Sequence, residues 1–180
     1  MPRYVALLRS VNVAGHGRLA MADLRNSFDA LGFSEVTTFI QTGNVLFTTK
    51  STKLPALAQA IETQLAHDFG QAPAVIMRTV DALLRIGAAS PYARKGDPSR
   101  HHVTFLVEAP SKDRLAAFVV PKSGRDELRI DGSEVYVHTP DGYADTKLTG
   151  AYLERHLGVL STTRNWNTVT KLCALAGDTV

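Results

Sequence analysis

Short glycine turns join two pairs of β-rich segments in this chain, and this feature constrains the fold more than any other. The first pair, residues 36–41 and 45–49, flanks Thr42-Gly43-Asn44. The second pair, residues 127–130 and 134–138, flanks Asp131-Gly132. Asn, Asp and Gly tolerate the positive φ angles of tight hairpin turns. Both pairs are therefore predicted to be antiparallel hairpins.

Apolar periodicity around the first hairpin predicts two helices and two further strands. Apolar residues recur at spacings of three and four in residues 21–31 and 54–69, which is typical of one buried helix face. Residues 4–12 and 73–79 read as strands, the first apolar and then polar at its end. The first half thus reads β-α-β-β-α-β, the order of a ferredoxin-like module.

The second half repeats most of this order. A strand at residues 102–108 and a short helix at 112–118 precede the second hairpin, and a helix capped by Asp145 or Thr146 follows and ends at Leu157. One more helix is expected from Arg164 to Ala176. We therefore expect an α+β fold of two ferredoxin-like modules, the second being β-α-β-β-α plus a C-terminal helix. The expected domains are 1–90 and 101–180, joined by a linker at 91–100 that is rich in Pro, Gly and charge.

Composition limits the classes of function. The 180 residues are 44% hydrophobic, enough for a real core, and no apolar run approaches the length of a membrane span. The net charge of +3 comes from scattered Lys and Arg residues and not from a basic stripe, so nucleic-acid binding is not expected. The N-terminus lacks the pattern of a signal peptide, and the single cysteine fits a reducing compartment; we expect a cytoplasmic protein.

A glycine motif near the N-terminus imitates a dinucleotide-binding fingerprint. Residues 15–20 read Gly-His-Gly-Arg-Leu-Ala, and Glu35 follows about where a ribose-binding acid would stand. That motif needs a parallel β-α-β unit, whereas the next strand here turns straight back into a hairpin. We interpret the glycines as a loop and expect no cofactor.

Histidine and cysteine do not form a recognisable catalytic or metal pattern. None of the six histidines lies at metal-ligand spacing from cysteines or carboxylates, so no metal site is predicted. His101, His102 and His138 would approach one another if their strands are neighbours, but solvated strand ends are the expected environment. Cys173 lies on an apolar helix face and reads as a small core residue. The aromatic residues that stack RNA bases on ferredoxin-like sheets are missing from the expected strands.

The stretch Ser161 to Leu172 is the most unusual in composition. It opens with three hydroxyl residues, which are followed by Arg164, two asparagines and the only tryptophan. Thr162 or Thr163 is expected to cap the helix. A cation in a first helical turn opposes the helix dipole, which suggests that an anion, either a ligand or an internal carboxylate, rests there. Trp166 is expected to be buried in the core beneath the helix. Two roles remain open for the stretch: completing the fold, or binding a ligand.

Three stretches together resemble a bacterial family known as domain of unknown function 1697 (DUF1697). They are residues 7–15 with 21–25, residues 38–45 and residues 162–169. The resemblance implies an α+β fold with ferredoxin-like modules. It implies no activity, substrate or cofactor.

The leading functional hypothesis is a small-molecule binding protein that accepts an anionic ligand, a phosphate or carboxylate, in a cleft between the two modules. Guanidinium and amide groups suit such a ligand, and no general base is evident. One alternative is a transferase or hydrolase acting on a phosphorylated or nucleotide substrate, with Asp23 or Asp145 in proton transfer. The other is a protein-interaction module that associates through a sheet. The expected ligand-binding residues are Arg9, Asn12, Gln41, Asn44, Arg164, Asn165 and Asn167.

Overall fold

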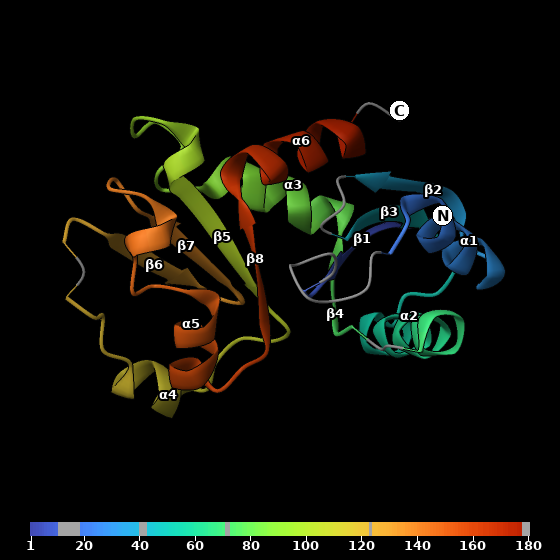
Figure 1. Ribbon diagram of the computed structural model, residues 1–180, viewed down its shortest axis with the longest axis horizontal. Coiled ribbons are helices and arrows are strands. Elements are labelled where there is room, and N and C mark those ends of the chain that lie inside the picture. Colours follow the sequence, from blue (N-terminus) through green and yellow to red (C-terminus); the bar gives the residue numbers. More distant parts are fainter. Residues whose placement is uncertain (11–18, 40–42, 71–72, 123, 178–180) are drawn as a thin grey trace. The chain divides into compact units, whose positions relative to one another are not determined.

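Two antiparallel sheets of four strands, each packed with helices, make up the α+β fold (Figure 1). The computed structural model describes residues 1–10, 19–39, 43–70, 73–122 and 124–177. The chain forms two compact units, Met1–Leu84 and Arg85–Val180. They divide within a helix and not at the expected linker, residues 91–100, which lies in the second unit.

The first unit follows the β-α-β-β-α-β order expected from its sequence. Its strands lie in the order β2-β3-β1-β4, and all neighbouring strands are antiparallel. The apolar run at the N-terminus forms a central strand, as expected for a segment buried on both faces. A further helix follows directly. The elements are β1 Arg3–Leu8, α1 Met21–Ala30, β2 Ser34–Phe39, β3 Asn44–Thr48, α2 Leu54–Phe69, β4 Val75–Thr79 and α3 Val80–Ala89.

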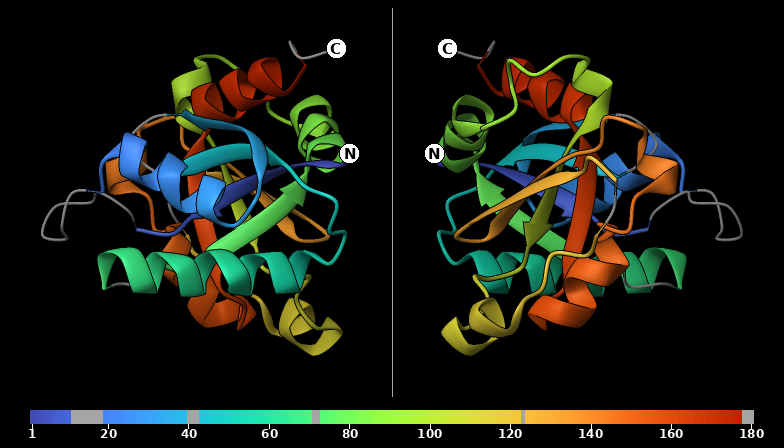
Figure 2. Two further views of the ribbon diagram at one scale, coloured as in Figure 1. Left: turned by 90° about the vertical axis from the view of Figure 1, so that its right-hand side faces the viewer. Right: turned by 90° about the vertical axis from the view of Figure 1, so that its left-hand side faces the viewer.

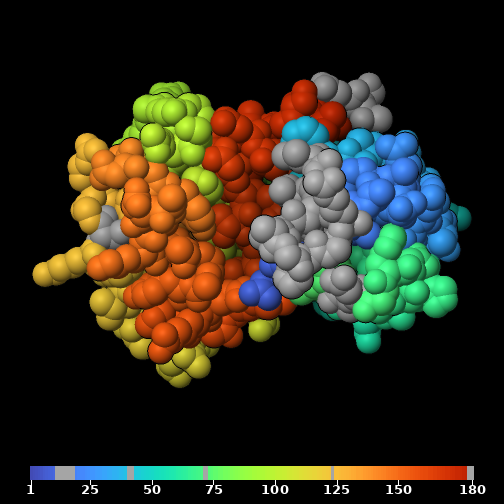
Figure 3. Space-filling view, viewed as in Figure 1, coloured from blue at the N-terminus to red at the C-terminus, as the bar shows by residue number. Residues whose placement is uncertain are grey.

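The helices α1 and α2 cover one face of the first sheet, as the left view of Figure 2 shows. Alternate residues of β1 and β3 point to this face because strand side chains have a period of two. Phe47 of β3 packs edge-on against Phe28 of α1, with 5.3 Å between ring centroids, and stacks on Phe33 at 4.5 Å. The predicted helical stripes of both helices are thereby buried, while their outer sides lie on the surface (Figure 3).

Antiparallel pairing also excludes a dinucleotide-binding unit here. Both neighbours of β1 in the sheet run antiparallel to it, and the helix begins at Met21, after the glycine motif. The motif itself falls mostly outside the described residues. Glu35, the expected ribose ligand of such a site, instead accepts a hydrogen bond of 2.6 Å from the Thr48 hydroxyl.

The second unit contains a strand that the sequence did not reveal. Its strands lie in the order β6-β7-β5-β8, again all antiparallel; α5 packs on one face, and α4 contacts α5. Its order is thus β-α-β-β-α-β followed by a helix, where we expected only three strands. The elements are η1 Pro98–Arg100, β5 His101–Leu106, α4 Lys112–Ala117, β6 Glu127–Asp131, β7 Glu134–His138, η2 Tyr143–Asp145, α5 Gly150–Leu157, β8 Ser161–Asn165 and α6 Trp166–Gly177.

Two local predictions in this unit have different outcomes. The hairpin is confirmed: Asp131 pairs with Glu134, and Gly132 has a φ of 59°. The cap of α5 was predicted wrongly, because Thr149 accepts the Tyr152 N–H at 3.2 Å. Thr146 instead donates to Asp126 and accepts the Leu148 N–H, so it orders the preceding loop.

None of the helices in the described part of the chain is both long and apolar enough to span a membrane.

The helices α3 and α6 approach closely at a glycine. A Cβ atom placed on Gly87 would lie 2.7 Å from the Cys173 sulfur, nearer than van der Waals contact allows. Burial raises the pKa of the Cys173 thiol. The sulfur therefore fills the space that Gly87 leaves open, which agrees with its predicted role as a small packing residue.

We expect Gly87→Ala to destabilise the protein by about 1–3 kcal/mol, because overpacking outweighs the gain of about 1 kcal/mol for Ala over Gly in a helix. Urea unfolding measures this change. Adding Cys173→Ala should restore most of the loss. Gly177→Ala is the control, because nothing lies within 4 Å of a Cβ built there; a stabilised Gly87→Ala protein would contradict the contact.

Candidate functional site

The stretch that was expected to open a helix is instead the edge strand β8. Residues Ser161 to Asn165 pair antiparallel with β5, and α6 begins only at Trp166. The prediction of a helix from Arg164 was wrong by two residues at its start. β-branched Thr162 and Thr163 favour the extended backbone, and the pairing partner lies about sixty residues away, so local sequence does not reveal it.

Asn165 caps α6, whereas Thr162 and Thr163 make other hydrogen bonds. The Asn165 side-chain oxygen accepts the Asn167 N–H at 3.0 Å, which satisfies a backbone donor in the first turn of the helix. Thr162 accepts a hydrogen bond from Arg164, and Thr163 is bonded to the Thr104 hydroxyl at 2.8 Å. The cap predicted at Thr162 or Thr163 therefore lies at Asn165.

The strand places Arg164 and Asn165 on opposite faces of the second sheet. Arg164 pairs with Val103, and Val103 pairs with Tyr136, so these three side chains share one face. Asn165 pairs with His102 on the other face. A helical turn would have let the two residues approach one ligand together, but the two-residue period of a strand separates them.

Arg164 is a buried cation. Its side chain is 7% exposed, and its Nη1 donates to the Thr162 hydroxyl at 2.7 Å and to the Thr163 carbonyl at 3.0 Å. Burial lowers the pKa of Arg164 to about 10, so the guanidinium is still charged at neutral pH. Trp166, the first residue of α6, is buried as expected.

On the opposite face, Asn165 fixes the tautomer of His102. Because its oxygen accepts the Asn167 N–H, its Nδ2 is the donor, which lies 2.8 Å from the Ser99 carbonyl and 3.3 Å from His102 Nε2. His102 Nε2 must then accept, so the ring proton is on Nδ1. Within the described part of the chain this buried Nδ1 has no hydrogen-bond partner.

The histidines of β5 are buried, contrary to the solvated strand ends that we expected. Burial, together with a charge on His101, lowers the pKa of His102 to about 4, and its ring lies 4.1 Å from that of Tyr143. His101 lies on the other face, with its ring 4.9 Å from that of His138, and its Nε2 donates to the Lys95 carbonyl. Burial also lowers the pKa of His101. Sequence reasoning expected His102 at a solvated strand end, although it is the first residue of the expected apolar strand at residues 102–108.

The predicted site residues of the first unit are only partly described. Asn44 is fully buried at the start of β3, and its Nδ2 donates to the Phe39 carbonyl at 3.0 Å. Arg9 follows β1, where its backbone N–H donates to the Ala74 carbonyl at 2.9 Å. Asn12 and Gln41 lie outside the described residues. Their role in binding stays a prediction.

Carboxylates are absent from the buried polar residues of the described segments. Asp23 and Asp145, the expected proton-transfer groups, are both exposed. Among the described residues, no group of three or more His, Cys, Asp or Glu side chains is placed to hold a metal ion.

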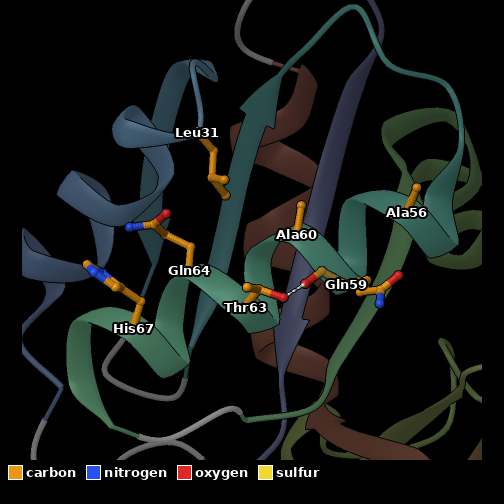
Figure 4. A pocket seen from close by; sticks show the side chains of 7 residues that line it. All are labelled: Leu31, Ala56, Gln59, Ala60, Thr63, Gln64 and His67. Carbon is orange, nitrogen blue, oxygen red and sulfur yellow. Dashed lines mark hydrogen bonds between the residues drawn. The ribbon is translucent and has the colours of Figure 1, made fainter.

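A shallow, open depression lies on the outer side of α2, and Figure 4 shows its lining side chains. Thr63 donates there to the Gln59 carbonyl at 2.8 Å. It contains no Arg or Lys and none of the predicted site residues, so it does not suit an anion. The lining residues are Leu31, Ala56, Gln59, Ala60, Thr63, Gln64 and His67.

Burial of His102 predicts that stability falls on acidification. Its ordinary pKa is 6.5, and the folded value is about 4. Between these values the unfolded chain binds a proton that the folded chain does not, so stability rises with pH in this window. Wild type loses free energy of unfolding between pH 6.5 and pH 4. The variant His102→Gln, which lacks the ring, should lose less of it, by about 2–3 kcal/mol at most. Part of the pH dependence of stability should remain in this variant, because burial also lowers the pKa of His101.

Denaturant unfolding at several pH values between 4 and 7 measures the effect. The control is His67→Gln, because the His67 side chain is 82% exposed. Identical slopes for wild type and His102→Gln would show that His102 titrates normally.

Comparison with known proteins supports the fold and the family. A search of curated proteins finds no match. The solved structure of the conserved bacterial protein SP0830 from Streptococcus pneumoniae is similar, with a TM-score of 0.74 and 22% identity over 97% of this chain and 98% of that chain. At this identity the likeness shows the fold alone. A family model described as a protein of unknown function, DUF1697, matches residues 1–136, so the chain belongs to the DUF1697 family.

Proposed function

We propose that the protein binds a small anionic ligand, a carboxylate or phosphate ester, through the guanidinium of Arg164. The observation that carries this proposal is the burial of a charged side chain that is only 7% exposed on an edge strand. Lysine and arginine are rarely buried so fully, because removing a charge from water costs several kcal/mol. A ligand anion would add charge-assisted hydrogen bonds to those that Arg164 already makes inside the protein.

The local geometry suits an oxygen anion. A guanidinium presents five N–H donors in a planar fork, which matches the two oxygens of a carboxylate or phosphate. The bonds from Nη1 to Thr162 and Thr163 hold the side chain in one orientation. A preorganised fork loses less conformational entropy when it binds a ligand.

The charges on the same face favour a small ligand over a polyanion. Glu134 and Thr162 flank Phe105 from its two sides, and Asp131 pairs with Glu134. A long polyanion such as a nucleic acid would approach these carboxylates and be repelled, because like charges interact within the Debye length of about 10 Å. Arg9, Asn12, Gln41, Asn44 and Asn167 remain proposed ligand contacts, whereas Asn165 lies on the face opposite to Arg164 and is not part of the site proposed there.

Binding is favoured over a transferase or hydrolase activity. The expected acids Asp23 and Asp145 are exposed, and His102 is a buried neutral base on the face opposite to Arg164. The group that could move a proton and the group that could hold an anion are therefore separated by the sheet.

A thermal-shift screen of inorganic phosphate, nucleotides and citrate tests the proposal. A ligand at about 100 times its Kd stabilises the folded state by about 2.7 kcal/mol, which raises the melting temperature. We expect Arg164→Gln to reduce the shift strongly and Arg164→Lys to reduce it less, because lysine keeps the charge but loses the fork.

The matched control is Arg129→Gln. Arg129 pairs with Tyr136, so it belongs to the same row of side chains on the same face, but it is exposed on β6. Circular dichroism establishes that each variant is folded. Equal ligand-induced shifts in wild type and in folded Arg164→Gln and Arg164→Lys proteins would refute the proposal.

A further inference from the structure

The two units repeat each other at the level of strand register. Strands β2-β3-β1-β4 correspond in order and direction to β6-β7-β5-β8. The third residue of β1, Val5, pairs with Leu46 and Arg78, and the third residue of β5, Val103, pairs with Tyr136 and Arg164. Arg78 and Arg164 therefore occupy equivalent positions in the two sheets.

Their immediate surroundings are also equivalent. Each arginine is the fourth residue of a five-residue edge strand, and a helix begins two residues later, α3 at Val80 and α6 at Trp166. The residue between arginine and helix caps that helix in both units: Thr79 accepts the Ala82 N–H, as Asn165 accepts the Asn167 N–H.

The two arginines share burial and conformation. Arg78 is 8% exposed and Arg164 is 7% exposed. In each case Nη1 donates to the carbonyl oxygen of the preceding residue, at 2.8 Å to Met77 and at 3.0 Å to Thr163. A buried cation at one position has many explanations, but the same buried cation at two equivalent positions indicates a common role.

We infer that Arg78 is the first unit's counterpart of Arg164 and binds the same class of anion, a carboxylate or phosphate oxygen; this inference rests on the function proposed above. Asn44, already a proposed ligand contact, lies on the same face of the first sheet as Arg78. Leu7 is two residues from Val5, so the two side chains share a face, and the residues that pair with Leu7, Asn44 and Ile76, share the face of Arg78, which pairs with Val5. Both side chains already donate hydrogen bonds inside the protein, Asn44 to the Phe39 carbonyl and Arg78 to the Met77 carbonyl, and amide and guanidinium groups are the kinds of donor that also bind an oxygen anion.

Calorimetric titration of the full chain tests this inference, with inorganic phosphate in one arm and citrate in the other to distinguish the two anion classes. Wild type should bind two equivalents of the favoured anion. Arg78→Gln should lose one equivalent, as should Arg164→Gln, and the double variant should lose both. Arg25→Gln, an exposed arginine of α1, is the control and should bind like wild type.

The outcomes separate this inference from the proposed function. Unchanged titration of Arg78→Gln beside a loss in Arg164→Gln would overturn the role of Arg78 and leave Arg164 as the binding residue. Unchanged titration of both would overturn both, and the arginines would then serve to satisfy edge-strand carbonyls. Arg78→Lys, which keeps the charge, is titrated in place of Arg78→Gln if circular dichroism shows that Arg78→Gln is unfolded; binding equal to wild type would overturn the inference.

Discussion

Antiparallel pairing of β8 with β5 is the constraint on which the second unit depends. It completes a four-stranded sheet, sets the point at which α6 begins and decides the direction of every side chain from Ser161 to Asn165. Because strand side chains alternate, this one pairing places Arg164 on one face and Asn165 beside His102 on the other. The chemistry available on each face follows from that alternation.

Burial then changes the chemical character of the side chains on both faces. Burial lowers the pKa of Arg164 and of His102, but with opposite consequences at neutral pH. Arginine begins so far above neutrality that it stays charged, whereas histidine becomes firmly neutral. One face of the sheet therefore holds a fixed cation and the other holds a neutral acceptor, so the proposed anion-binding group and the buried base lie on opposite faces of the sheet.

The repeat of the two units places the buried arginines Arg78 and Arg164 at equivalent positions of the two sheets. Sequence similarity does not reveal the repeat, because the residues around Arg78 and Arg164 differ: Ile76 stands where the second unit has Thr162. Register reveals it, since hydrogen-bonded pairing assigns each residue an unambiguous partner. Equivalent edge strands, equivalent caps and equivalent guanidinium conformations together mark a shared position in the fold.

The sequence by itself determined the element order of the first unit, both hairpins and the helix stripes, because hydrophobic periodicity and the glycine turns act over a few residues. It also carried the family resemblance. Only the tertiary structure decided that residues 161–165 form a strand, that Asn165 is the cap and that His101 and His102 are buried. The polar stretch has no apolar alternation of its own, so its conformation is set by hydrogen bonds to β5, which is distant in sequence and adjacent only after folding.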